Sequence, residues 1–194
     1  MLIVSTDAAA VETALAGGLL VCPACGVGLS PWGHSVWREV RLVGRAERRR
    51  LRRTVCRTCS TTHVLMPDDM LLRRRDGVEV VGAALTQKAQ GKGHRPIAVV
   101  LGRPASTVRG WLRRFAAMAG ELREHFTRWA HSIDPSHDRL FAGGSALCDA
   151  VEAVGVLGMV AVRRFGPRPP WPLASLVTGG GLLCNTSSPW ARPV

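Results

Sequence analysis

The chain has 194 residues and a formal net charge of +12, with 26 Lys and Arg against 14 Asp and Glu. This length excludes a large catalytic fold but allows one domain or two to three small ones, and a polycation has nucleic acid as its first candidate partner. All but two of the basic residues are Arg, which a GC-rich coding sequence also favours, so the positions of the arginines are more informative than their number.

The first residues predict a short strand and a helix. Residues 2–5 are β-prone, and Asp7 is placed to cap a helix that runs to Ala16 and ends at the pair Gly17-Gly18. No basic segment precedes the apolar residues, and Asp7 and Glu12 interrupt them, so we expect neither a signal peptide nor a membrane span. The expected location is the cytoplasm, in association with the nucleoid.

Four of the six cysteines form two Cys-x-x-Cys pairs, Cys22/Cys25 and Cys56/Cys59. In a reducing compartment such pairs are more often metal ligands than disulfides. Runs of β-type residues at 35–43, 51–55 and 62–66 accompany them, which predicts a small zinc ribbon. Four thiolates fill the coordination sphere of Zn²⁺, so the metal would be structural.

Other uses of the cysteines are less well supported by the sequence. Free thiols or a redox pair are the alternative, but the βαβ context of a thioredoxin-like motif is missing. His63 follows Cys59 by four residues and fits a place next to the metal ligands better than a place among them. Cys148 and Cys184 have no paired neighbour and are interpreted as small buried apolar residues.

The connection between the two cysteine pairs is rich in arginine. Residues 38–57 contain nine Arg and two Glu, for a local charge of +7. We expect Arg48, Arg49 and Arg50, at the turn of the ribbon, to contact the DNA backbone.

Three helices are predicted after the ribbon. Asp76 and Glu79 have the spacing of a capping box for a helix that stops at Gly91 or Gly93. A second helix spans 96–101, and residues 102–104 form a tight turn. The third starts near Ala105, bends or restarts at Gly120 and continues to about Ile133.

The second and third of these helices have the spacing of a helix-turn-helix. Ile97, Leu101, Val108 and Leu112 form a shared core, Ala98 is small where the helices cross, and Gly102 turns the chain. Residues 88–114 hold seven basic residues and no acidic one. A solvated basic helix is the alternative, but core pattern, turn and charge coincide. The predicted DNA-contacting residues are Arg95, Arg103, Ala105, Ser106, Thr107, Arg109, Arg113 and Arg114, with Arg109 or Arg113 as the reader of guanine.

The remainder predicts one more helix, near 145–165, followed by a loosely ordered Gly/Pro-rich tail. The expected fold class is α+β, with three parts. Residues 1–74 form an N-terminal strand and helix plus the zinc ribbon of three short strands, residues 75–134 an all-α helix-turn-helix domain, and residues 135–194 the last helix and the tail.

Several of these segments together resemble a known family. The runs CPACGVGLSPWGH, CRTCSTTHVLMPD, GKGHRPIAVVLGRPASTVRGWLRRF and HSIDP resemble an uncharacterised zinc-ribbon and helix-turn-helix family of high-GC, actinobacterial-type bacteria, found near insertion-sequence transposase genes. The resemblance covers residues 1–135 most firmly. It implies Cys22, Cys25, Cys56 and Cys59 as zinc ligands and residues 95–115 as a DNA-binding unit.

The function expected from the sequence is sequence-specific binding of double-stranded DNA, as a transposition accessory factor or a transcription regulator. We expect no enzyme and no small-molecule substrate, because Asp138, Asp149 and Glu152 are the only acids after residue 135 and have no strand platform. The alternative is a zinc-ribbon module that binds a transposase or polymerase without reading DNA, and a thiol redox sensor is a third class. A transposase or a second copy of the chain are the expected protein partners.

Overall fold

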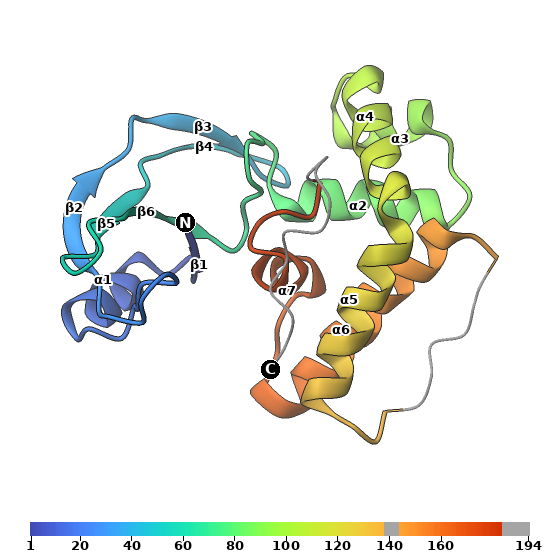
Figure 1. Ribbon diagram of the computed structural model, residues 1–194. Helices are drawn as coiled ribbons and strands as arrows, with labels where there is room; N and C mark the ends of the chain where they lie inside the picture. Colours follow the sequence, from blue (N-terminus) through green and yellow to red (C-terminus); the bar gives the residue numbers. More distant parts are fainter. Residues whose placement is uncertain (138–143, 184–194) are drawn as a thin grey trace.

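The computed structural model describes residues 1–137 and 144–183. The fold is α+β, as predicted, with the strands and the first helix at one end of the molecule and the other helices at the other end (Figure 1). One sheet has four strands in the order β1-β6-β5-β2: β1 (Leu2–Val4), β6 (Thr62–Pro67), β5 (Arg52–Val55) and β2 (Ser30–His34). β1 is parallel to β6, and the other pairs are antiparallel. Cys184 and the rest of the predicted tail from residue 184 lie outside the described residues.

A separate hairpin extends from this sheet toward the helices. It consists of β3 (Arg38–Arg41) and β4 (Ala46–Arg49), which pair antiparallel, and its tip lies beside the start of α2 (Figure 1). The strand predicted over 35–43 is present in shorter form as β3, whereas the sequence did not predict β2 or β4. The chain changes pairing partner between β2 and β3, because β2 pairs with β5 whereas β3 pairs with β4.

The predicted N-terminal elements are confirmed. The carboxylate of Asp7 accepts hydrogen bonds from the backbone N–H groups of Ala9 and Ala10, at the start of α1 (Ala8–Ala16). Gly17 follows as the C-terminal cap. Arg52 of β5 forms an ion pair with Glu12 of α1 at 2.9 Å, which holds this helix on the sheet.

The larger core lies among the helices. They are α2 (Val78–Ala89), α3 (His94–Leu101), α4 (Ala105–Ala117), α5 (Ala119–Ile133) and α6 (Ala146–Phe165). The break between α4 and α5 is at Met118, two residues before the glycine from which a restart was predicted. Ser145 caps α6 through the backbone N–H of Cys148, close to the predicted start. Phe115, Leu122 and Phe126 are fully buried in this core.

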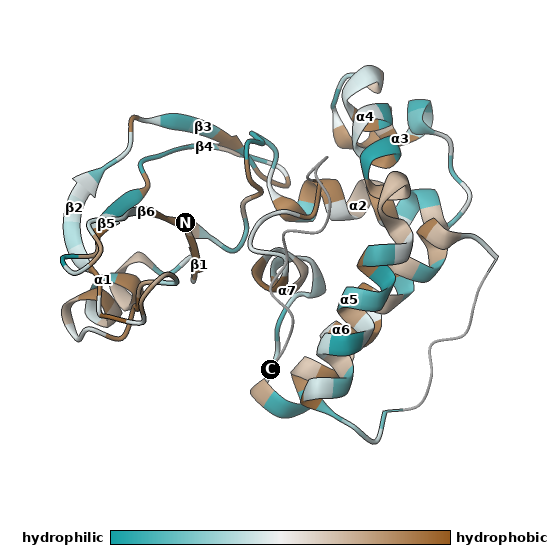
Figure 2. Ribbon diagram, in the orientation of Figure 1, coloured by the Kyte–Doolittle hydropathy of each residue, from teal (hydrophilic) through white to brown (hydrophobic). Residues whose placement is uncertain are grey.

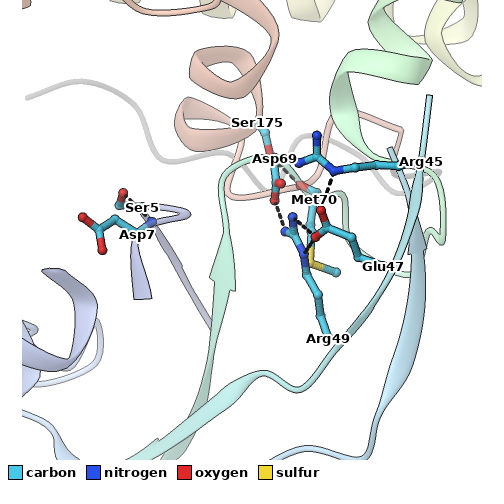
Figure 3. Close-up of polar contacts among 8 residues, drawn as sticks. All are labelled: Ser5, Asp7, Arg45, Glu47, Arg49, Asp69, Met70 and Ser175. Atoms are coloured by element: carbon cyan, nitrogen blue, oxygen red, sulfur yellow. Dashed lines mark hydrogen bonds and ion pairs between the residues drawn. The ribbon is translucent and has the colours of Figure 1, made fainter. Parts of the chain in front are cut away.

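The segment after α6 is ordered where the structure describes it, so the predicted loose tail is wrong for residues 166–183. Pro170–Val177 form α7, and Trp171 is buried against α2. A Cβ on Gly82 would lie 2.3 Å from the Trp171 ring, so the glycine makes room for it. The hydroxyl of Ser175 donates to the backbone oxygen of Met70 at 2.8 Å (Figure 3). These contacts connect the end of the described chain to the junction between sheet and helices.

A buried carboxylate, that of Asp76, lies at this junction. It accepts from Nε of Arg103, in the turn between α3 and α4, at 2.6 Å, and Nε of Arg41 in β3 lies 3.5 Å away. The predicted capping box at Asp76 is therefore wrong. Gly77 precedes α2 without a side-chain cap, because the two arginines occupy the carboxylate.

The distribution of apolar and polar residues matches the packing of the strands and helices. The apolar strands β1 and β6 and the inner parts of the helices are brown in Figure 2, whereas β3 is largely hydrophilic. Within residues 1–137 and 144–183, every helix is too short or too polar to cross a bilayer.

We predict that Asp76→Ala lowers the free energy of unfolding by about 3 kcal/mol, because it leaves two largely covered guanidinium groups without their carboxylate. Urea denaturation followed by circular dichroism measures this change. Glu124→Ala is the control, since Glu124 is an exposed acid on α5 and its removal should change stability by less than about 0.5 kcal/mol. Equal effects of the two substitutions would show that the junction does not depend on Asp76.

Candidate metal centre and basic helix face

The two Cys-x-x-Cys pairs adopt the same local turn. The backbone N–H of Cys22 donates to the carbonyl of Val27 at 2.8 Å, and that of Cys56 donates to the carbonyl of Thr61 at 2.9 Å. In each turn the fourth residue after the first cysteine is left-handed: Gly26 has φ of 72° and Ser60 has φ of 57°. Because the backbone curls in the same way around each pair, both pairs present their sulfurs to one point.

The four sulfurs form a compact cluster, all within 4.8 Å of one another. The Sγ atoms of Cys22 and Cys59 are 3.6 Å apart, and those of Cys25 and Cys56 are 3.4 Å apart. A tetrahedral metal with sulfur at about 2.3 Å requires sulfur separations of about 3.8 Å. The spacing is too long for a disulfide, so the cluster fits a metal ion.

The pKa values of these thiols diverge because the groups interact with their neighbours. The hydroxyl and the backbone N–H of Thr61 lower the pKa of Cys59 to about 6. A backbone hydrogen bond from Val27 lowers the pKa of Cys25, but burial and the neighbouring thiols, first Cys56, outweigh it and raise the pKa to about 12. Four thiolates this close repel one another, and a divalent cation among them removes that cost.

His63 on β6 lies next to this cluster. Its Nε2 is 3.4 Å from Sγ of Cys22, and the ring is 7% exposed. Burial lowers its pKa, so the imidazole is neutral at pH 7. A neutral ring with its proton on Nε2 donates to the Cys22 sulfur, which is the arrangement of a residue that orients a ligand.

The second candidate site is the pair α3 and α4. Gly102 is left-handed, with φ of 60° and ψ of 41°, and the N–H of Arg103 donates to the carbonyl of Ala98. One side of α4 is buried against the core through Val108, Trp111, Leu112 and Phe115. The predicted core residues Ile97 and Ala98 of α3 are buried as well.

The opposite side of α4 is basic and open. Ala105, Arg109 and Arg113 are four residues apart in turn, and all three are exposed. Ser106 is also exposed, Thr107 and Arg114 are half-buried, and Arg95 is exposed on α3. The side chains predicted to face DNA on this helix therefore share one side, except that Arg114 lies nearer to the core.

Two of the predicted DNA-contacting arginines are engaged inside the protein. Arg103 pairs with Asp76. Arg49 pairs with Asp69 at 2.7 Å and with Glu47 at 2.8 Å, and Glu47 also pairs with Arg45 (Figure 3). Both side chains are less than one-fifth exposed, so we assign them to holding the fold together.

Their neighbours Arg48 and Arg50 are exposed. The guanidinium of Arg48 lies 5.8 Å from the centre of the Trp37 ring, and Nε of Arg50 donates to the carbonyl of Ser35. They are not adjacent to α4 in the sequence, and the hairpin carries them toward the sheet end of the molecule.

Sequence reasoning missed a third group of arginines, Arg73, Arg74 and Arg75, which lie between β6 and α2. They line a cavity of about 400 Å³ together with Arg41, Arg114 and residues of the first turns of α4. The signal available in the sequence was the run of three consecutive arginines. The sequence does not show what this run contacts, because only the fold brings α4 beside it.

Comparison with known proteins gives one match. Residues 22–111 match the model of a family described as a domain of unknown function (DUF6431). The matched stretch begins at the first cysteine of the cluster and ends on α4, so it contains the four cysteines and Arg109 but not Arg113 or Arg114. No curated protein and no solved structure matches the chain.

We predict that Cys56→Ser abolishes metal binding and unfolds the sheet around the cysteines, because three thiolates leave the site open. Native mass spectrometry measures the metal content, and circular dichroism follows the helices, which should remain largely formed. Cys148→Ser is the matched control, since Cys148 lies outside the cluster on α6. Unchanged metal content in Cys56→Ser would contradict the four-cysteine site.

We predict that His63→Ala weakens metal binding about 10- to 100-fold without changing the stoichiometry, because the histidine orients Cys22 and is not itself a ligand. Competition with a chromogenic chelator measures the affinity. His34→Ala removes an exposed histidine of β2 and should leave the affinity unchanged. Loss of the bound metal in His63→Ala would instead make His63 a ligand.

Proposed function

We propose that the protein binds double-stranded DNA in a sequence-specific manner, with α3 and α4 as a helix-turn-helix. The observation that carries this proposal is the division of α4 into a buried apolar side and an exposed side with Arg109 and Arg113. Residues 88–114 contain no acidic side chain, so nothing within this segment neutralises the exposed arginines.

The dimensions of α4 suit the major groove. An α-helix with its side chains is about 10 to 12 Å across, and the groove is about 12 Å wide. In this mode the first residues of the second helix reach the base edges. Ser106 and Arg109 are the exposed polar side chains nearest that end, and Arg113 follows one turn later. Arginine at such a position recognises guanine through O6 and N7.

The metal in this proposal is structural Zn²⁺, held by Cys22, Cys25, Cys56 and Cys59 as a zinc ribbon. Four sulfur ligands at tetrahedral spacing are typical of zinc and leave no position for a substrate. The zinc ribbon supports the sheet from which the hairpin and Arg48 and Arg50 extend. Iron is the other metal that four thiolates hold, and visible absorption by the purified protein would identify it.

The biological role that fits this reading is recognition of a mobile-element end or of an operator. The four sequence segments that resemble the transposase-associated family contain the zinc ligands and the helix-turn-helix. Selection of bound sequences from a random duplex pool tests the proposal, and a palindromic site would indicate that two copies bind together.

A second candidate function is docking of a protein partner, such as a transposase, beside α3. Val99 and Val100 are 82% and 66% exposed, and Val43 at the hairpin tip is 64% exposed. These valines line one groove of about 570 Å³ between the hairpin and α3. Capture of a partner that resists nuclease, together with no enrichment in the DNA selection, would favour this function over DNA recognition.

We predict that Arg109→Ala weakens binding to the selected sequence by about 1 to 3 kcal/mol, and weakens binding to a scrambled duplex much less, because it removes a base contact. Fluorescence anisotropy with both duplexes measures the two affinities. Arg164→Ala on α6 removes the same charge from an exposed site and is the matched control. An equal loss on both duplexes would make Arg109 a phosphate contact.

A further inference from the structure

The cavity between residues 73–76 and α4 is strongly basic. Five arginines surround it, and Asp76 is the one acidic residue in its lining. The carboxylate of Asp76 is already shared between Arg41 and Arg103. The cavity therefore has an excess of positive charge that the single carboxylate of Asp76 does not balance.

The backbone holds the arginine run in place. The N–H of Arg41 in β3 donates to the carbonyl of Arg75 at 2.7 Å, and the N–H of Gly77 donates back to the carbonyl of Arg41 at 2.9 Å. These bonds form a parallel bridge that attaches the segment to the edge of the hairpin. The side chains of Arg73 and Arg75 are nevertheless exposed. They are charged groups on a fixed backbone, which lowers the entropy lost when they bind a ligand.

Arg114 approaches the same cavity from α4. A Cβ built on Gly110 would lie 3.0 Å from Nη1 of Arg114, so the guanidinium lies over this glycine, one turn back along the helix. Nε of Arg114 is shielded from solvent and has no hydrogen-bond acceptor among the described residues. This guanidinium is directed along the helix toward the cavity and retains a donor for a ligand.

The cavity lies beside the proposed reading side of α4. Ala105, Arg109 and Arg113 form one row along the helix, and Ser106, Gly110 and Arg114 form the adjacent row, which lines the cavity. When a helix enters the major groove, the phosphates of the groove wall lie beside it. A phosphate on the side of the second row would lie at the mouth of this cavity.

We propose that this cavity binds one phosphodiester of the DNA backbone, held by Arg73, Arg75 and Arg114 with the hydroxyl of Thr107. This inference rests on the proposed function and deepens it. The contact carries no sequence information but sets the depth and angle at which α4 enters the groove.

The test compares two double variants of the full chain, Arg73→Gln with Arg75→Gln and Arg163→Gln with Arg164→Gln. All four side chains are exposed, and both variants lose the same net charge. The control pair lies in the last turn of α6, at the end of the molecule opposite α4 (Figure 1). Circular dichroism and metal content confirm that each variant is folded.

The measurement is the affinity for the selected duplex and for a scrambled duplex over a range of salt concentrations. The first double variant should weaken binding to both duplexes by the same factor and reduce the slope of log Kd against log salt by about 1, whereas the control pair should leave the slope unchanged. A slope change no larger than that of the control overturns the phosphate site and leaves the proposed function standing. Absence of salt-dependent binding by the unmodified protein overturns both.

Discussion

The geometry of the molecule depends on the carboxylate of Asp76. It is the point at which β3 of the hairpin, the start of α2 and the turn between α3 and α4 meet, through Arg41 and Arg103. Two guanidinium groups in a mostly covered site need an acceptor, and an acid between them fixes their positions. The orientation of the cysteine-held sheet relative to α4 follows from this pair of contacts.

Features with a local cause could be predicted from the sequence. The two cysteine pairs, the cap at Asp7 and the helix after Ser145 depend on residues within a few positions of one another. Features decided by distant contacts could not. Asp76 has the spacing of a helix cap, but the two arginines that bind it come from positions 35 residues earlier and 27 later. The Gly/Pro-rich segment after α6 has only a weak local preference for regular secondary structure. Its position depends on a distant contact, because the Trp171 ring packs on Gly82 of α2.

The residues of the candidate sites also divide into those that a local sequence pattern predicts and those that only distant contacts place. All four cysteines could be predicted because metal ligation requires a characteristic spacing. The arginines could not be sorted by sequence, since the same side chain serves internal ion pairs at Arg49 and Arg103 and an open surface at Arg109 and Arg113. Only the fold distinguishes these uses. The run at 73–75 lines the cavity because the bridge to β3 holds its backbone in place. The Arg114 guanidinium can lie over Gly110 because that residue has no side chain.

The contact of α7 with the junction has a consequence for the order of folding. Ser175 and Met70 are 105 residues apart in the sequence, and the loop between them contains α2 to α6. Contacts that close so long a loop form late and slowly. During synthesis on the ribosome, the cysteine sheet, the hairpin and α4 all emerge before α7 can cover Gly82 and Met70. The four-cysteine cluster and the pair α3 and α4 are therefore complete in sequence while the surface that joins them is still open to water and to chaperones.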